Sequence, residues 1–146
     1  MVVVFERDRV LEQEMQLVNP ESVLETNRLF LEPLRRHHAA VLYPLLQDER
    51  IYTYIPQDPP ISLEALEQRY QKLEQRFSPD STQAWLNWAV CIKASKDYAG
   101  YIQATVQANH SAKIAYVFAS LFWGQGYAQE ACKILLSVIA KRLRCG

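Results

Sequence analysis

Three strand-like runs separated by short polar connections restrict the fold of this chain more than any other feature. Apolar and polar side chains alternate in residues 85–92, 98–107 and 113–119, with the period of a half-buried β-strand. The connections at 93–97 and 109–112 are too short for a helical crossover, so we expect antiparallel hairpins. The sequence therefore predicts a three-stranded antiparallel meander.

Helical spacing of apolar residues is found on both sides of this meander. Residues 37–47 have such spacing, with Pro44 expected to kink the helix or keep it short. Ser62 is suited to cap a second helix. The apolar stripe of that second helix comprises Leu63, Leu66, Tyr70, Leu73 and Phe77. A first strand at 28–34 and a last amphipathic helix at 127–144 complete a pattern that predicts an α+β fold.

Composition narrows the classes of partner. With 146 residues, 49% of them hydrophobic, the chain is long enough for one globular domain with a substantial core. Sixteen basic and sixteen acidic side chains cancel, so the chain lacks the field that attracts nucleic acid or an anionic membrane. A small-molecule or protein substrate is therefore favoured. Cys91, Cys132 and Cys145 are odd in number and lack metal-ligand spacing, which predicts reduced thiols and no metal site.

The N-terminal residues do not have the pattern of a targeting segment. Residues 2–5 are apolar, but four charged residues follow at 6–9, which leaves no apolar run for a signal peptide or a membrane span. Together with the cysteines, this pattern favours a cytoplasmic location. We expect residues 1–23 to form an extension and residues 24–146 to form the domain, with Met15 as a candidate alternative start.

The segment at 118–128 combines a strand end, two glycines and the start of the last helix. Gly124 and Gly126 allow a sharp turn in which successive backbone N–H groups converge on an anion. The first turn of the following helix adds unpaired N–H donors and the positive end of the helix dipole. Two spaced glycines also form ordinary strand-to-helix connections. These residues alone therefore leave a phosphate site and a plain turn as alternatives.

The element order and the residues at this turn resemble the GNAT superfamily of acyl-CoA-dependent N-acyltransferases. The chain is most similar to its ribosomal-protein N-terminal acetyltransferase branch, which is RimJ/RimL-like. Residues 25–31, 88–90, 99–101 and 123–131 carry the resemblance. It implies a GNAT-like α+β fold, with a mixed, mainly antiparallel sheet flanked by helices.

The resemblance also implies acetyl-CoA as the cosubstrate and no metal. The implied cofactor-binding residues are Phe118, Ala119, Ser120, Trp123, Gly124, Gln125, Gly126, Tyr127 and Ala128. Backbone N–H groups of the last four would hold the pyrophosphate, and the backbone of the first three would pair with the pantetheine arm like an added strand. Trp123 stands where the superfamily commonly has Arg or Gln. This departure costs little because the backbone makes the contact.

The implied reaction is direct attack of a primary amine on the thioester, with a backbone N–H stabilising the oxyanion. The amine would belong to a protein N-terminus or a small molecule. Relatives often carry a glutamate on the third meander strand, where this chain has Lys113. The candidate catalytic residues are Glu130, Tyr116 and Ser120, with His110 as a further candidate. Structural roles compete with these, because a first-turn glutamate stabilises a helix dipole, a strand tyrosine packs and a loop histidine is solvated.

Superfamily members continue after this helix with further strands and a helix, so we expect the domain to be C-terminally incomplete. Two functions remain open: an active N-acetyltransferase, and a catalytically inactive, truncated domain that binds coenzyme A weakly or acts as an interaction module. A homo-oligomer that completes the sheet edge would supply the missing wall. Nucleotide binding in a Rossmann unit is disfavoured, because that unit needs a βαβ crossover and a third glycine.

Specificity for the acceptor amine is expected from three parts of the chain. They are the loop around Tyr52, Tyr54 and Pro56, the first two helices, and the missing C-terminal part. The aromatic residues of this loop can line a pocket for a peptide or a small amine, or pack beneath a proline-rich loop.

Overall fold

The computed structural model describes residues 2–7, 21–107 and 111–145, so Met15 and His110 lie outside the described residues. Its elements are β1 (Val2–Arg7), β2 (Leu24–Glu25), β3 (Leu29–Pro33), α2 (His38–Leu45), η1 (Glu49–Thr53), α3 (Leu63–Leu73), β4 (Gln83–Ile92), β5 (Tyr98–Gln107), β6 (Ala112–Phe118), η2 (Ser120–Phe122) and α4 (Tyr127–Cys145). The strands form one six-stranded sheet in the order β1-β6-β5-β4-β3-β2. Each neighbouring pair is antiparallel, so the predicted meander is confirmed.

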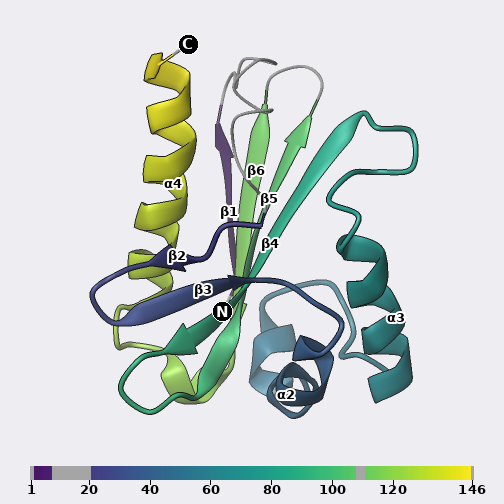
Figure 1. Ribbon diagram of the computed structural model, residues 1–146. Helices are drawn as coiled ribbons and strands as arrows, with labels where there is room; N and C mark the ends of the chain where they lie inside the picture. Colours follow the sequence, from purple (N-terminus) through teal and green to yellow (C-terminus); the bar gives the residue numbers. More distant parts are fainter. Residues whose placement is uncertain (1, 8–20, 108–110, 146) are drawn as a thin grey trace.

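Helices cover both faces of the sheet, with α4 on one face and α2 and α3 on the other (Figure 1). Beneath α4, even-numbered residues of β4, β5 and β6 form most of the larger apolar cluster. That cluster includes Leu86, Trp88, Val90, Ile92, Ile102, Ala104, Val106, Ile114 and Phe118. The helix adds Ala131 and Leu135, which are both fully buried. The period-two alternation of the sequence therefore specifies which side chains face α4.

Odd-numbered residues of the same strands face α2 and α3. Ala89 of β4 and Val117 of β6 are buried there in a second cluster. The helices contribute Ala39, Leu42, Leu66 and Tyr70. Pro44 lies in the last turn of α2, which ends at Leu45, so the predicted short helix is confirmed.

Gly100 permits β5 and β6 to approach closely. A Cβ atom at this position would lie 1.9 Å from the Val117 carbonyl oxygen and 2.8 Å from Phe118 Cα. Atoms cannot approach so closely, so no other residue type fits here without movement of the backbone. The fit of Gly100 positions the end of β6, from which the glycine turn begins.

The two ends of α3 agree only in part with the sequence pattern. The Ser62 hydroxyl accepts a hydrogen bond from the Ala65 N–H at 3.0 Å, so the predicted N-cap is confirmed. The prediction that Phe77 continues the apolar stripe is wrong. The helix ends at Leu73, and Arg76 adopts a left-handed conformation with φ of 64°. Phe77 therefore lies outside the helix, where it is 52% exposed.

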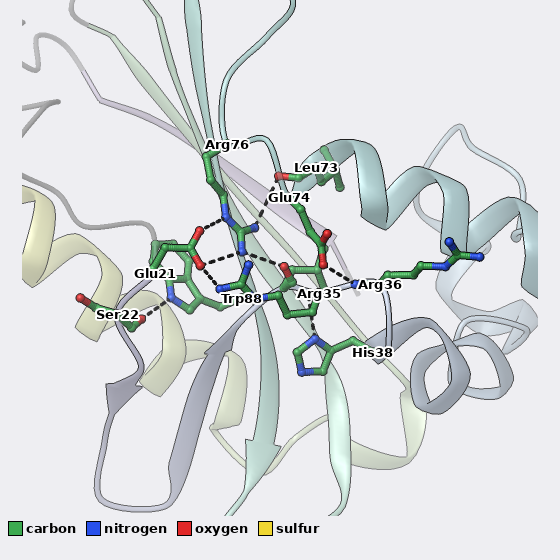
Figure 2. A network of polar contacts seen from close by, with 10 residues as sticks. Glu21, Ser22, Arg35, Arg36, His38, Leu73, Glu74, Arg76 and Trp88 are labelled. Carbon is green, nitrogen blue, oxygen red and sulfur yellow. Dashed lines mark hydrogen bonds and ion pairs between the residues drawn. The ribbon is translucent and has the colours of Figure 1, made fainter.

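Arg76 fixes the end of α3 against the start of the sheet (Figure 2). Its guanidinium is buried and donates from Nε to Glu21 at 2.6 Å and from Nη2 to the Leu34 carbonyl at 2.8 Å. The hydrogen bond from Arg76 is the main reason that the pKa of Glu21 is lowered. Nearby, the Trp88 indole donates to the Ser22 carbonyl at 2.9 Å. These bonds satisfy a buried charge that would otherwise be costly.

β1 lies along the outer edge of β6, within the part of the chain that the sequence predicts as an extension. The pairing runs from Val2 opposite Val117 to Arg7 opposite Ala112. The short apolar run at the N-terminus gave no alternating signal, so this strand was not predicted. Its register ends before Phe118, so the glycine turn lies beyond this strand pairing.

Candidate functional site

The turn between β6 and α4 has a backbone conformation that favours glycine. Gly124 and Gly126 have φ values of 78° and 81°, and α4 begins directly afterwards at Tyr127. Glycine adopts positive φ without the steric cost that a Cβ atom brings. A Cβ on Gly126 would also lie 3.3 Å from Arg28 Nη2, whereas one on Gly124 would meet no described atom within 4 Å. Both positions therefore favour glycine for conformation, and Gly126 for space as well.

A cavity of about 210 Å³ lies at this turn. It is lined by Tyr116, Phe118, Phe122, Trp123, Gly124, Gly126, Tyr127, Ala128 and Gln129. Six of the nine predicted cofactor-binding residues line it, whereas Ala119, Ser120 and Gln125 do not. The first N–H groups of α4 have no preceding helical carbonyl to bind, so they are available as donors at this end of the cavity.

An ion pair holds this turn against β3. Arg28, just before β3, donates from Nε to Glu130 Oε1 at 2.8 Å and from Nη1 to the Gln125 carbonyl at 2.9 Å. Its guanidinium also stacks 4.5 Å from the centre of the Tyr127 ring. One side chain thus contacts the turn, the first residue of α4 and the acidic residue in its first turn. We call Arg28, Glu130 and Thr26 the β3–α4 clamp.

Glu130, a candidate catalytic residue, is fully engaged in this clamp. Its Oε2 accepts hydrogen bonds from the Thr26 hydroxyl and, at 2.9 Å, from the Arg28 N–H. Burial raises the pKa of Glu130, but the bonds from Thr26 and Arg28 outweigh this effect and lower it. The carboxylate is therefore ionised at neutral pH and has both oxygens bound, an arrangement suited to positioning the helix.

Tyr116 and Ser120, the other candidates, lie in different surroundings. Tyr116 lines the cavity, its ring centre is 5.6 Å from that of Phe118, and burial raises its pKa. The Ser120 N–H donates to Asp48 Oδ2 at 2.6 Å, and Asp48 also accepts from the Arg50 N–H at the start of η1. Burial raises the pKa of Asp48, but its hydrogen bonds with Ser120 outweigh this effect and lower it. Lys113 is exposed on β6.

The backbone groups predicted to pair with a pantetheine arm have partners within the chain. The Phe118 carbonyl accepts from the Trp123 indole at 2.8 Å, and the Ala119 N–H donates to the Ala99 carbonyl at 3.0 Å. The indole of Trp123 thus folds back over the end of β6. Trp123 stands where the superfamily commonly has Arg or Gln. Its side chain therefore has a structural role here, because the indole binds the end of β6.

The loop around Tyr54, which is predicted to select the acceptor, contacts Trp123 at the start of the glycine turn. The ring of Tyr54 meets that of Trp123 edge-on, with centroids 6.4 Å apart. The Arg50 guanidinium lies 5.4 Å from the centre of the Trp123 ring. Tyr52 instead lines a second cavity on the opposite face of the sheet.

The clamp and the Asp48 contact were not found by sequence reasoning. Thr26 and Arg28 lie in a segment that carries the family resemblance, but their partner Glu130 is more than a hundred residues away. Asp48 lies 72 residues before Ser120. Periodicity reports only local structure, so contacts of this range need a fold before they can be recognised.

The whole arrangement agrees with a known family. The family model described as an acetyltransferase (GNAT) domain matches residues 28–146. The chain belongs to the GNAT acetyltransferase family. The expected α+β GNAT fold is thereby confirmed, together with the antiparallel meander and the helices on both faces of the sheet.

Solved structures share this GNAT fold at low sequence identity. A protein from Vibrio cholerae assigned as a ribosomal-protein-serine acetyltransferase has a TM-score of 0.65 and 17% identity over 87% of this chain and 71% of its own. A GNAT-family acetyltransferase from Bacillus anthracis has a TM-score of 0.62 and 17% identity, with 84% and 69% covered. RimL, the α-N-acetyltransferase of ribosomal protein L7/L12, has a TM-score of 0.62 and 18% identity, with 83% and 66% covered. These neighbours show the shared fold, and this chain spans about two thirds of their length.

Three further observations complete the description of this GNAT chain. No curated protein matches the sequence at a significant level. Within residues 2–7, 21–107 and 111–145, no helix is long and apolar enough to cross a membrane. The same residues contain no group of three or more His, Cys, Asp or Glu side chains that could hold a metal ion.

Proposed function

We propose that this GNAT domain transfers an acetyl group from acetyl-CoA to a primary amine. The observation that carries the proposal is the glycine turn, where two residues of positive φ lead into the N-terminus of α4 beside a cavity. This geometry fits a pyrophosphate, because it gathers N–H donors and admits a ligand where side chains would intrude. Hydrogen bonds to a charged acceptor contribute about 1.5–3 kcal/mol each.

In this proposal the glycine turn binds the cofactor, and the β3–α4 clamp positions the turn. N–H groups of Gln125, Gly126, Tyr127 and Ala128 hold the pyrophosphate, and acetyl-CoA supplies the acetyl thioester when bound. Arg28 binds the Gln125 carbonyl, which fixes the orientation of the peptide group that carries the Gly126 N–H.

Tyr116 and Glu130 receive different roles. Tyr116 lines the cavity and keeps its proton at neutral pH because burial raises its pKa. Its Oη is thus the candidate donor to a departing thiolate. Glu130 positions α4, because both of its oxygens are already bound. Ser120 is held by Asp48, so its N–H becomes available only when that contact opens.

A second function, weak coenzyme A binding without turnover, has its own supporting observations. The Phe118 carbonyl and the Ser120 N–H are already paired within the chain. β1 also occupies the β6 edge up to Val117. Both features compete with an added strand formed by a pantetheine arm. Because β1 already pairs with β6, a homo-oligomer would extend the sheet at its outer strands, β1 and β2. A cytoplasmic location, consistent with the free thiols of Cys91 and Cys132, is also part of the proposal.

Calorimetric titration with acetyl-CoA, followed by a thiol-release assay, tests the proposal. The amine panel includes a peptide with a free N-terminal serine and small primary amines. We expect binding by the natural chain and at least a tenfold loss in Gly126→Val, because valine is strained at positive φ and crowds Arg28 (about 1.4 kcal/mol or more). Ala94→Val, in an exposed hairpin, is the matched control. Absence of binding would contradict both functions, and binding without thiol release from any amine would favour the second.

A further inference from the structure

A second cavity, of about 250 Å³, lies on the sheet face opposite α4. Its wall on the sheet is formed by Asn87 of β4 and by Tyr101 and Gln103 of β5, and its other wall by α3. Asn87 and Gln103 are directly opposite each other in the strand register, so their side chains share this face. The cavity is close to the size of ordinary small-molecule sites, which begin at roughly 300 Å³.

The end of this cavity near β3 is rigid. Leu34 and Leu73 both line it, and their carbonyl groups both accept hydrogen bonds from Arg76 (Figure 2). The buried Arg76 is itself paired with Glu21. This polar network ties the C-terminal end of α3 to the residue that follows β3.

Inside the cavity, one buried polar group has no partner among the described residues. Tyr70 is 3% exposed, and its hydroxyl has no hydrogen-bond partner among the described residues. Asn87, which lines the cavity from the sheet, is also 3% exposed. Buried polar groups are nearly always hydrogen-bonded, because leaving one unpaired costs free energy. The unpaired Tyr70 hydroxyl, with Asn87 on the facing wall, indicates a polar ligand group between them.

Two opposite charges lie at the mouth. Arg69 of α3 and Asp58 of the preceding loop both line the cavity and are exposed. Within the described ranges, neither makes an ion pair. Burial raises the pKa of Tyr52 to about 12 and that of Tyr70 further, while Arg69 opposes both shifts, which places its charge near the phenol groups. Tyr52 already donates to the Leu46 carbonyl at 2.7 Å, so Tyr70 is the neutral donor that remains for a ligand.

We propose that this cavity binds the acceptor as a small amino-carboxylate with an apolar body and a polar group at its far end. Arg69 binds the carboxylate at the mouth, Asp58 faces the ammonium group, and Tyr70 with Asn87 binds the far polar group. A zwitterion matches both charges of the mouth, whereas a simple amine leaves Arg69 unpaired. The acceptor role rests on the proposed function, but the binding site itself does not.

Three probes that differ by one group each test this assignment. Free L-tyrosine has the carboxylate and a far hydroxyl, tyramine lacks the carboxylate, and L-phenylalanine lacks the hydroxyl. Binding to the full chain is measured by ligand-observed NMR without acetyl-CoA. We expect L-tyrosine to bind about tenfold more tightly than either of the other probes.

Two substitutions assign the contacts. Arg69→Gln should remove the preference for L-tyrosine over tyramine, and Tyr70→Phe should remove its preference over L-phenylalanine. Lys72→Gln is the matched control, because Lys72 lies on the same helix, is exposed and does not line the cavity. Circular dichroism confirms that each variant is folded.

Several results would overturn the assignment: tyramine binding as tightly as L-tyrosine, no binding of any probe, or an unchanged preference in Arg69→Gln. A chain that binds L-tyrosine but not acetyl-CoA would contradict the proposed function and leave the site standing. A chain that binds acetyl-CoA but none of the probes would do the reverse.

Discussion

The two faces of the sheet carry cavities of similar size that are built from different parts of the chain. On the α4 face, the cavity of about 210 Å³ lies on a backbone turn, whose conformation depends on Gly124 and Gly126 and whose position depends on the Arg28–Glu130 ion pair. On the α2–α3 face, the cavity of about 250 Å³ is made of side chains, and the Tyr70 hydroxyl within it has no hydrogen-bond partner among the described residues. The cavity at the glycine turn is suited to a phosphate, a group that many ligands share, because backbone N–H groups can bind it. The cavity on the α2–α3 face is suited to one particular ligand, because its side chains define its shape and polarity.

The substitution with the largest expected effect, Gly100→Ala, should disrupt both cavities. Gly100→Ala places a methyl group 1.9 Å from the Val117 carbonyl, so β5 and β6 must separate. Because β6 leads into the glycine turn and Val117 packs on the α2–α3 face, neither cavity would keep its shape. We expect a loss of about 4 kcal/mol or more in the free energy of unfolding, measured by urea denaturation. Gly124→Ala, whose Cβ meets no described atom, should cost only about 1–2 kcal/mol; equal losses would contradict the steric argument.

A smaller effect separates the two faces. Arg28→Met removes the ion pair with Glu130 and the bond to the Gln125 carbonyl, while it keeps an unbranched apolar stem in place of the arginine methylenes. Arg28 is 41% exposed, so solvent screening limits the stability loss to about 1 kcal/mol. We expect coenzyme A affinity to fall about tenfold by calorimetry, because the turn is no longer held in place.

The matched control for Arg28→Met is Arg36→Met. Arg36 forms an ion pair with Glu67 on the other face of the sheet and is 53% exposed. This variant should lose similar stability and retain coenzyme A affinity. Equal affinity losses in both variants would show that the clamp has no specific role in cofactor binding.

A third change acts on α3 alone. Ser62→Ala removes the hydroxyl that accepts from the Ala65 N–H, and we expect it to cost about 1 kcal/mol in thermal or urea unfolding. Coenzyme A affinity should be unchanged, because α3 lies on the far face. Ser137→Ala, at an exposed position inside α4, is the control and should not destabilise the protein. A loss in the control equal to that of Ser62→Ala would argue against a capping role.

The same division explains what the sequence could predict. The meander, the Ser62 cap and the glycine turn follow from local signals, since alternation, capping and glycine placement act over a few residues. The end of α3 was misjudged at Phe77 because the left-handed conformation at Arg76 depends on its buried pairing with Glu21. The clamp and the second cavity required the fold, because Glu130 and Tyr70 meet their surroundings only through tertiary packing.

The smallest effect concerns pH and is confined to acidic conditions. His38 is the buried first residue of α2, where its Nε2 lies 3.0 Å from Glu32 Oε1 and its Nδ1 accepts from the Arg35 N–H at 2.9 Å. Burial is the main reason that the pKa of His38 is lowered from its usual 6.5, although Glu32 opposes this shift. In the window just below pH 6.5, the unfolded chain binds a proton at this position and the folded chain does not. Stability is therefore fully present above pH 6.5 and decreases as the pH falls through that window.

Three carboxylates have a lowered pKa: Glu130 on the α4 face, Glu32 in β3, and Glu21. Their contribution to the free energy of unfolding is lost only below their usual pKa of 4.5. The two regions should consequently weaken in sequence as the pH falls, first around His38 and later around Glu130. Urea denaturation between pH 7 and 5 should show a decline that His38→Gln removes and that His37→Gln, at an exposed position, retains. A decline that persists in His38→Gln would assign the acid sensitivity to another group, and hydrogen exchange that first increases in α4 would reverse the order of the two faces.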